Sequence, residues 1–171
     1  MYVNKKGAGM SESLLQFRPI GTIHSPHSGA AGTPIQPRYA RDARGRVELD
    51  PSFSDAVKDL EGFERIWLIF AFHRSQGFKS LVVPFKDTVP RGLFATRAPR
   101  RPNPIGMSCV RLLKVEGTTL YVADIDILDG TPLLDIKPYV PQFDAYPDAR
   151  AGWVDNAPKT GDIADKRFET D

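Results

Sequence analysis

The alternation of apolar and polar residues along the chain predicts several short strands and one helix. Residues 17–26 (FRPIGTIHSP) alternate loosely and predict a first strand, and RVELD within residues 41–50 predicts a second. The almost wholly apolar residues 65–74 (RIWLIFAFHR) are rich in β-branched and aromatic side chains and predict a central buried strand. Between these last two strands, Pro51, two serines and apolar residues at helical spacing predict a helix over residues 51–63.

The second half of the chain continues the strand pattern. A short strand, LVVPF, falls in a loop-rich segment over residues 75–92. Residues 106–117 and 118–130 predict two strands joined by a tight Gly-Thr turn, and residues 131–140 predict one more short strand. These six or seven strands do not alternate with helices, and no glycine-rich loop joins a strand to a helix. We therefore predict a mainly β fold, an antiparallel sheet or small barrel with one or two short helices, and not a Rossmann domain.

Length and composition fit one soluble domain. The chain has 171 residues, 41% of them apolar and 26% charged, and a net charge of +2 that is too small to indicate a nucleic-acid partner unless the basic residues cluster. No apolar run approaches the roughly 20 residues of a membrane span, and the N-terminus lacks a signal peptide's apolar core, so we expect a cytoplasmic protein without membrane contact. The expected organisation is a flexible N-terminal tail (1–16), a barrel domain (17–148) and a C-terminal extension (149–171) with Trp153 as its one large anchor.

Polar residues interrupt the apolar pattern in four places, and the first two are short. The long loop over residues 27–40 contains PIQPRY, for which a proline-stiffened turn is the simpler interpretation. His73 and Arg74 end the most apolar strand. Such a pair is often only the exit to solvent, but the strand ends of a barrel are also where small-molecule sites form.

The third and fourth interruptions carry charge. Residues 94–106 (FATRAPRRPNPIG) hold three arginines and three prolines, and no acidic residue follows until Glu116. Arginine suits phosphate and stacking on bases, and prolines reduce the entropy lost when a loop holds a fixed shape, although a solvated basic turn is the alternative. In the fourth place, Asp135 and Lys137 lie two residues apart on a predicted strand and so share one face, either exposed or part of a site.

These residues limit the chemistry that the chain can perform. The three histidines, His24, His27 and His73, lack the spacing of metal ligands, so we expect no metal site. No Ser-His-Asp pattern or phosphate-binding glycine loop is present in the sequence. The residues alone predict a small β protein with a rigid, arginine-lined site for an unassigned ligand.

Four segments together closely resemble the TsaA-like family, also called the tRNA N6-threonylcarbamoyladenosine N6-methyltransferases. They are PIQP (34–37), AFHR (71–74), GLFATRAPRRPNPIGMS (92–108) and DGTPLLDIKPYVP (129–141). The resemblance runs in collinear order from about Phe17 to about Asp148. It implies an S-adenosylmethionine-dependent methyltransferase on a small antiparallel β-barrel, forming a homodimer with the cofactor near the subunit interface. The implied substrate is N6-threonylcarbamoyladenosine at position 37, in the anticodon loop of tRNAs that read ACY codons, with the methyl group placed on N6.

The resemblance also implies roles for individual residues. The segments matching the cofactor contacts are Gln36, Pro37, Arg38, His73, Arg74, Arg97, Met107, Leu128, Asp129, Gly130 and Thr131. The residues assigned to RNA or substrate are Arg100, Arg101, Asn103 and Lys137. Asp135 is the first candidate for the group that accepts the N6 proton and Tyr139 the second, with water as the alternative. Arg97 and Arg101 are expected to hold the cofactor carboxylate, a tRNA phosphate or the substrate carboxylate.

Two other interpretations are compatible with the same residues. Some bacterial members of the family carry an extra C-terminal domain that has no counterpart in this sequence, so RNA affinity is expected to depend on the barrel dimer. A non-catalytic barrel that binds S-adenosylmethionine or RNA would keep the same pocket. A methyltransferase acting on a different substrate is a third possibility. Transfer of a labelled methyl group to modified tRNA distinguishes the tRNA methyltransferase from these two alternatives.

Overall fold

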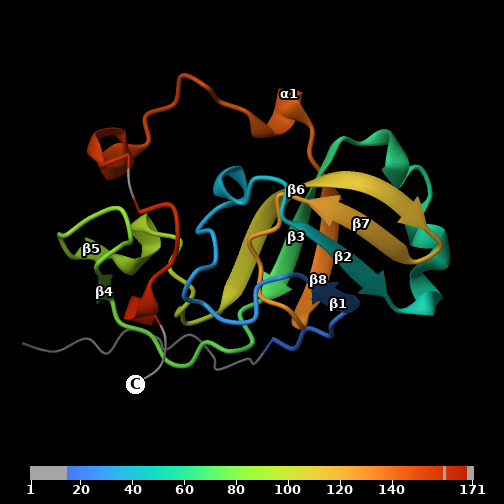
Figure 1. Cartoon of the computed structure of the whole chain (residues 1–171), viewed down its shortest axis with the longest axis horizontal. Helices are drawn as coiled ribbons and strands as arrows, with labels where there is room; N and C mark the ends of the chain where they lie inside the picture. Colours follow the sequence, from blue (N-terminus) through green and yellow to red (C-terminus); the bar gives the residue numbers. More distant parts are fainter. Residues whose placement is uncertain (1–14, 160, 169–171) are drawn as a thin grey trace, which may run out of the picture.

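Six antiparallel strands close into a barrel in the computed structural model of the chain, which describes residues 15–159 and 161–168. The strand order around the barrel is β1–β2–β7–β6–β3–β8 (Figure 1). The strands are β1 (Gly21–His24), β2 (Arg44–Leu49), β3 (Arg65–Ala71), β6 (Ile105–Glu116), β7 (Thr119–Ala123) and β8 (Thr131–Pro138). The predicted β-barrel is thus confirmed, while nearly all of the predicted N-terminal tail (1–16) lies outside the described residues.

The barrel interior is filled by alternate side chains of its strands. In β3, Ile66, Leu68 and Phe70 are buried, whereas the residues between them are only partly buried. A barrel wall has one face on the core and one face outward, so period-two burial appears even in a strand that is almost wholly apolar. The predicted central buried strand is thus buried on its inner face only.

Gly106, the last residue of the RPNPIG string, faces the barrel interior from β6. It pairs with Phe70 of β3 across the sheet. A Cβ atom at position 106 would lie 2.3 Å from Cε2 of the Phe70 ring. The glycine is thus required because the phenyl ring occupies the space of its absent side chain.

The helix predicted over residues 51–63 is absent. Two 3₁₀ segments, Pro51–Val57 and Leu60–Gly62, take its place, and Asp59 between them has a left-handed backbone with φ of 63°. That conformation ends any regular helix and redirects the chain toward β3. The apolar residues of this segment still contribute to the core, because Val57 and Leu60 pack against it.

The long connection between β3 and β6 forms a separate excursion beside the barrel (Figure 1). It contains a two-stranded sheet of β4 (Leu81–Val82) and β5 (Arg91–Gly92), followed by a 3₁₀ turn over Leu93–Ala95. The predicted LVVPF strand shrinks to two residues, because Pro84 has no N–H for a ladder.

The predicted hairpin is confirmed as β6 and β7, but β7 is shorter than the pattern suggested. It ends at Ala123, and the next residue, Asp124, has a left-handed backbone with φ of 63°. Gly117 in the hairpin turn has φ of +57°, which favours glycine. Residues 124–130 are therefore a connection and not a strand.

The C-terminal residues fold back across the barrel toward the excursion (Figure 1). After the short helix α1 (Pro141–Asp144), a 3₁₀ turn over Gly152–Asn156 brings the indole N–H of Trp153 to the carbonyl oxygen of Ala95, at 2.8 Å. The docked contact expected for Trp153 is therefore present. Further on, Ile163 forms a β-bridge with Pro34 in the β1–β2 connection.

In the described residues, no helix is both long and apolar enough to cross a membrane. The same residues contain no group of three His, Cys, Asp or Glu side chains arranged to hold a metal ion.

Candidate functional site

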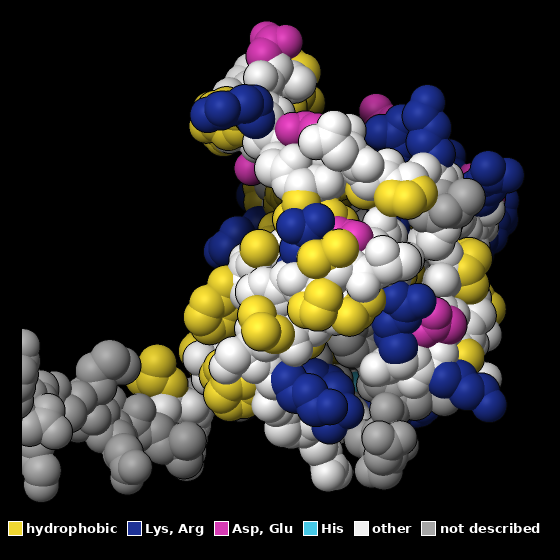
Figure 2. Space-filling model, turned by 90° about the vertical axis from the view of Figure 1, so that its left-hand side faces the viewer, with side chains coloured by type: hydrophobic (Ala, Val, Ile, Leu, Met, Phe, Trp, Pro, Cys, Tyr) yellow, Lys and Arg dark blue, Asp and Glu magenta, His cyan; other side chains and the backbone are white. Residues whose placement is uncertain are grey.

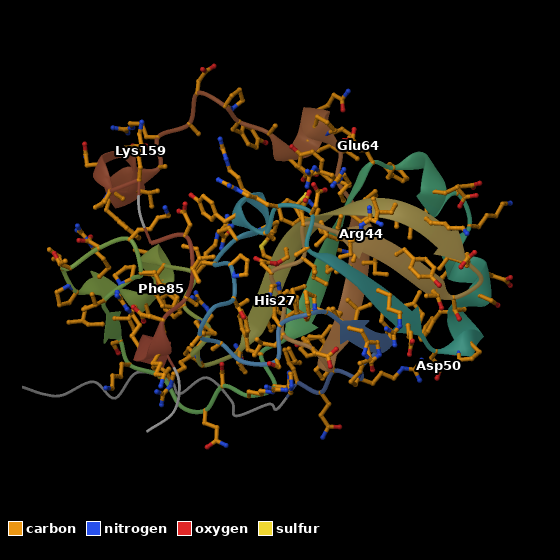
Figure 3. The ribbon with its side chains drawn as sticks, viewed as in Figure 1. His27, Arg44, Asp50, Glu64, Phe85 and Lys159 are labelled. Atoms are coloured by element: carbon orange, nitrogen blue, oxygen red, sulfur yellow. The ribbon has the colours of Figure 1, made fainter. Side chains whose placement is uncertain are left out.

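Three connections emerge at the same end of the barrel. The strands that lead into them, β1, β3 and β7, all run toward that end, and the strands that follow run back. The connections join β1 to β2 (residues 25–43), β3 to β6 (72–104) and β7 to β8 (124–130). Nearly every residue that the sequence assigned to the cofactor lies on one of these connections. Figure 3 shows His27 at this end, toward Phe85 of the excursion, and Asp50 and Glu64 at the opposite end.

Asp129 joins the β7–β8 connection to the end of β1. Its Oδ1 accepts a hydrogen bond from the Ser25 backbone N–H at 3.1 Å and lies 3.3 Å from Nδ1 of His24. The Ser25 N–H is the main reason that the pKa of Asp129 lies below its ordinary value. The Gly130 backbone N–H donates to the Ile23 carbonyl at 2.9 Å, which completes a rigid turn. This turn is the DGT segment that the sequence assigned to the cofactor.

Two arginines connect the β3–β6 and β1–β2 connections. Arg97 donates from Nη1 to Oε1 of Gln36 at 2.5 Å, and Arg74 donates from Nη1 to the Ser28 carbonyl at 2.6 Å. His73 is exposed, and partial burial of its ring, followed by the charge of Arg74, lowers its pKa. Residues predicted to share a cofactor site are therefore in contact although 61 positions separate Gln36 from Arg97.

Asp126 is a member of the site that the sequence interpretation missed. It lies in the β7–β8 connection between the buried Ile125 and Ile127. Its Oδ1 is buried and has no hydrogen-bond partner among the described residues. Burial raises the pKa of Asp126 from 3.8 to about 6, and the Ser108 hydroxyl and the charge of Arg97 partly oppose this rise.

The alternating DIDIL pattern around Asp126 explains why it was missed. Such alternation is typical of a strand with a solvated polar face. The Asp129-Gly130 turn that follows is the sequence feature that argues against a strand here. Residues 124–130 form a connection and not an exposed strand.

Arg100 borders a hollow on the excursion. The hollow has a volume of about 570 Å³ and is lined by Lys79, Leu81, Val82, Val83, Asp87, Thr88, Arg100 and Arg167. Three of these side chains are cationic, and Arg100 is held by a hydrogen bond from Nε to the Gln76 carbonyl at 2.9 Å. The basic clustering that the net charge did not reveal is thus found here.

Arg101 uses one nitrogen within its own loop. Nη1 donates to the carbonyl oxygens of Thr96 at 3.0 Å and Ala98 at 3.3 Å, and the guanidinium carbon lies 5.7 Å from the centre of the Phe94 ring. These bonds organise the basic loop that presents Arg97. Asn103 is exposed, and its carbonyl accepts a bond from the Ile105 N–H at 2.8 Å. Contact of Arg101 and Asn103 with RNA stays a prediction.

The β8 residues lie away from the three connections. Asp135 pairs in register with Ile69, an outward residue of β3, so it lies on the outer face of the barrel. Lys137 lies 2.8 Å from the Asp135 carboxylate, which confirms their shared face. The ring of Tyr139 packs against Trp67 at 5.9 Å, near the far end of the barrel. Their catalytic and substrate roles stay predictions.

Met107 occupies the same outer face. It pairs with Ile69 from the other side and is 51% exposed. It therefore reaches a cofactor only from outside the barrel wall.

Comparison with known proteins now identifies this arrangement. A family model described as the tRNA-methyltransferase O N-terminal domain matches residues 22–145. The chain belongs to the tRNA-methyltransferase O family. The match contains all three connections of the site, and it confirms the resemblance found in the sequence motifs.

Relatives in this family span archaea and bacteria. A probable S-adenosyl-L-methionine-binding protein of Pyrococcus abyssi is 52% identical over 143 residues, or 83% of this chain and 77% of that protein. The tRNA (adenine(37)-N6)-methyltransferase of Escherichia coli is 39% identical and covers 85% of this chain and 66% of its own. The crystal structure of TrmO from Pseudomonas aeruginosa has a TM-score of 0.69 at 44% identity, over 81% of this chain and 62% of that one. This chain thus spans slightly less than two thirds of the latter two proteins.

The C-terminal residues, beyond the matched tRNA-methyltransferase O domain, hold two of the site's connections together. Gly32 N–H donates to the Ala164 carbonyl at 2.9 Å and Ile35 N–H to the Asp162 carbonyl at 3.0 Å. Lys86 Nζ on the excursion lies 2.5 Å from the Asp162 carboxylate. We call residues 151–159 and 161–168 the C-terminal clasp.

Gly161→Val is expected to release part of this clasp. Gly161 has φ of +78°, and a Cβ there would lie 2.6 Å from the Phe85 carbonyl oxygen, so any larger residue is strained. Hydrogen exchange should rise by about 10-fold or more at the Ile35 and Ala164 amides, while the barrel amides change little. Gly29→Ala is the control, because open space surrounds that position. Equal protection in both variants would contradict a fastening role.

Proposed function

We propose that this chain is an S-adenosylmethionine-dependent methyltransferase that methylates N6 of adenine 37 in tRNA, with N6-threonylcarbamoyladenosine as the substrate form. The observation that carries this proposal is the hydrogen bond between Arg97 and Gln36 at one barrel end, where the charge of Arg97 also acts on the carboxyl of Asp126. That cluster lies within the domain matched to a tRNA-methyltransferase family. The proposed reaction takes place in the cytoplasm, where tRNA is modified.

The cluster fits the charges of S-adenosylmethionine. Among the described residues, Arg97 donates a side-chain hydrogen bond from Nη1, to Gln36. Its other guanidinium N–H groups suit the ligand's carboxylate. Gln36, His73 and the Asp129-Gly130 turn would complete the binding residues. When bound, S-adenosylmethionine supplies a methyl group already activated for transfer.

The basic hollow on the excursion supports an RNA partner. Lys79, Arg100 and Arg167 line it, and Arg38 is exposed on the neighbouring connection. Anticodon loops present unpaired bases and closely spaced phosphates, which arginine contacts well. We propose that this hollow holds the loop backbone while the target base enters the cluster.

We further propose a homodimer, as the resemblance implies. Exposed apolar side chains gather on the excursion, and Figure 2 shows such side chains among cationic ones on that end of the molecule. Outside the basic hollow they include Phe78, Val89 and Phe94. A patch of this kind supports a protein interface. Sedimentation should show a dimer for the wild type and a monomer for Phe78→Glu; a wild-type monomer would contradict the proposal.

Transfer of an isotope-labelled methyl group tests the function. The purified chain is incubated with labelled S-adenosylmethionine and tRNA carrying N6-threonylcarbamoyladenosine at position 37, and the nucleosides are identified by mass spectrometry. We expect one added methyl group on N6 of that nucleoside. Cofactor binding without transfer would favour a non-catalytic barrel. Transfer only to tRNA that lacks the threonylcarbamoyl group would favour a different substrate.

Asp135→Asn tests the first candidate base. Because Asp135 lies on the outer face with Lys137, we expect turnover within about threefold of wild type, as for an ordinary surface substitution. Cofactor affinity and turnover are measured side by side. A loss of about 100-fold or more in turnover at unchanged affinity would restore Asp135 as the base.

A further inference from the structure

The carboxyl group of Asp126 lies where two of the three connections approach the barrel wall, and no described hydrogen bond uses its Oδ1. The hydroxyl of Ser108, a buried residue of β6, hydrogen-bonds the carboxyl, and the positive charge of Arg97 on the β3–β6 connection lowers its pKa. A buried acceptor without a partner lowers the stability of the fold. Its presence beside the cofactor cluster points to a ligand group that donates a hydrogen to it.

We propose that Asp126 is the proton acceptor of the methyl transfer and takes the proton of N6 on the target adenine. This inference rests on the proposed function, since it concerns the same site and reaction. As the N6–CH₃ bond forms, the N6–H bond breaks and its proton passes to Oδ1 of Asp126. The electron pair of the broken S–CH₃ bond stays on the sulfur, which becomes a neutral thioether.

The chemistry of the target nitrogen creates the need for such a group. The N6 of N6-threonylcarbamoyladenosine belongs to a ureido group, whose carbonyl delocalises the nitrogen lone pair and makes it a poor nucleophile. It carries a single hydrogen, and an N–H of this kind donates readily to a carboxylate. Removing the proton during attack restores electron density to N6, which is the usual contribution of a general base.

The surroundings of Asp126 give it a suitable basicity. Burial raises the pKa of its carboxyl to about 6, so the group is largely ionised at neutral pH and holds a proton better than an exposed aspartate. Two other titratable groups approach it. The charge of Arg97 on the β3–β6 connection lowers its pKa, and Nε2 of His27 on the β1–β2 connection lies 2.9 Å from the carbonyl oxygen of the adjacent Ile125.

Asp126→Asn and Ser108→Ala are the two informative variants, with Asp55→Asn as the matched control. Asp55 is exposed in the β2–β3 connection at the opposite end of the barrel, and it receives the same chemical change. For each protein, kcat and KM are measured between about pH 5 and pH 9 with modified tRNA. Affinity for S-adenosylmethionine is measured by calorimetry without tRNA, and thermal unfolding is followed over the same pH range.

Asp126→Asn is expected to lower kcat by about 10²- to 10⁴-fold and to retain cofactor affinity within about threefold. In the wild type, kcat/KM should rise with pH through about 6 as Asp126 ionises, and the variant should lack this rise. Ser108→Ala should shift the rise to higher pH, because the hydroxyl lowers the pKa of Asp126.

Unfolding supplies a readout that does not depend on turnover. The pKa of Asp126 in the folded chain lies above its ordinary value of 3.8, so the folded state binds this proton more tightly than the unfolded state. Its contribution to wild-type stability must then fall as pH rises from about 4 to about 6, and Asp126→Asn should lack this fall.

Two outcomes would overturn the inference. Wild-type turnover in Asp126→Asn, with an unchanged pH profile, would exclude a role in proton transfer. A weaker cofactor affinity that accounts for the whole loss, with kcat unchanged, would make Asp126 a cofactor-binding residue instead. Failure of the proposed function looks different, because the wild type itself would then transfer no methyl group to the modified tRNA.

Discussion

Gly106→Ala is expected to destabilise the barrel by about 2–3 kcal/mol, as in other overpacked cores. The added Cβ would lie 2.3 Å from the ring of Phe70, which is only 4% exposed and has no room to withdraw. For a chain of this size the loss corresponds to a melting temperature lower by about 4–12 °C. Thermal unfolding followed by circular dichroism measures it.

A second substitution tests the stated cause. Phe70→Leu removes the ring, so Gly106→Ala should cost less in that background than in the wild type, with a coupling of about 1 kcal/mol or more. Gly62→Ala serves as the control, because open space surrounds Gly62 and its φ is not positive. Additive effects of the substitutions at positions 70 and 106 would show that the ring is not the obstacle.

Arg97→Ala is expected to weaken binding of S-adenosylmethionine by about 10- to 100-fold, the range for losing a hydrogen bond to a charged group. The substitution also removes the bond between the β3–β6 and β1–β2 connections, which Arg97 makes to Gln36. Because the charge of Arg97 lowers the pKa of Asp126, its loss should also move the pH dependence of turnover upward. Calorimetry and the pH profile measure the two effects separately.

Two further variants define what Arg97 contributes. Arg97→Lys keeps the charge but not the planar fork, so it should recover the pH profile better than the affinity. Arg44→Ala removes an exposed arginine from the barrel wall and should leave both quantities unchanged (Figure 3). Cofactor affinity that is the same in wild type and Arg97→Ala would contradict the assignment of Arg97 to the cofactor.

Much of this architecture follows from local pattern. Strand alternation, the Gly117 turn and the motif around Asn103 depend on neighbouring residues, and local physics governs them. These features are why the barrel, the hairpin and the family could be predicted. The helix over residues 51–63 could not, because its apolar spacing suits two 3₁₀ turns equally well once Asp59 adopts a left-handed backbone.

Only the closed barrel decides the composition of the site. Closure brings Gln36 to Arg97 and places the Ser108 hydroxyl near Asp126, although neither pair is close in sequence. Burial of a carboxyl depends on all the side chains that surround it in space, so a local sequence pattern cannot indicate it. By itself, the sequence determined the strands, the basic loop and the family, since each depends on residue order. The tertiary structure decided which carboxyl lies in the site, because desolvation depends on what surrounds a group in space.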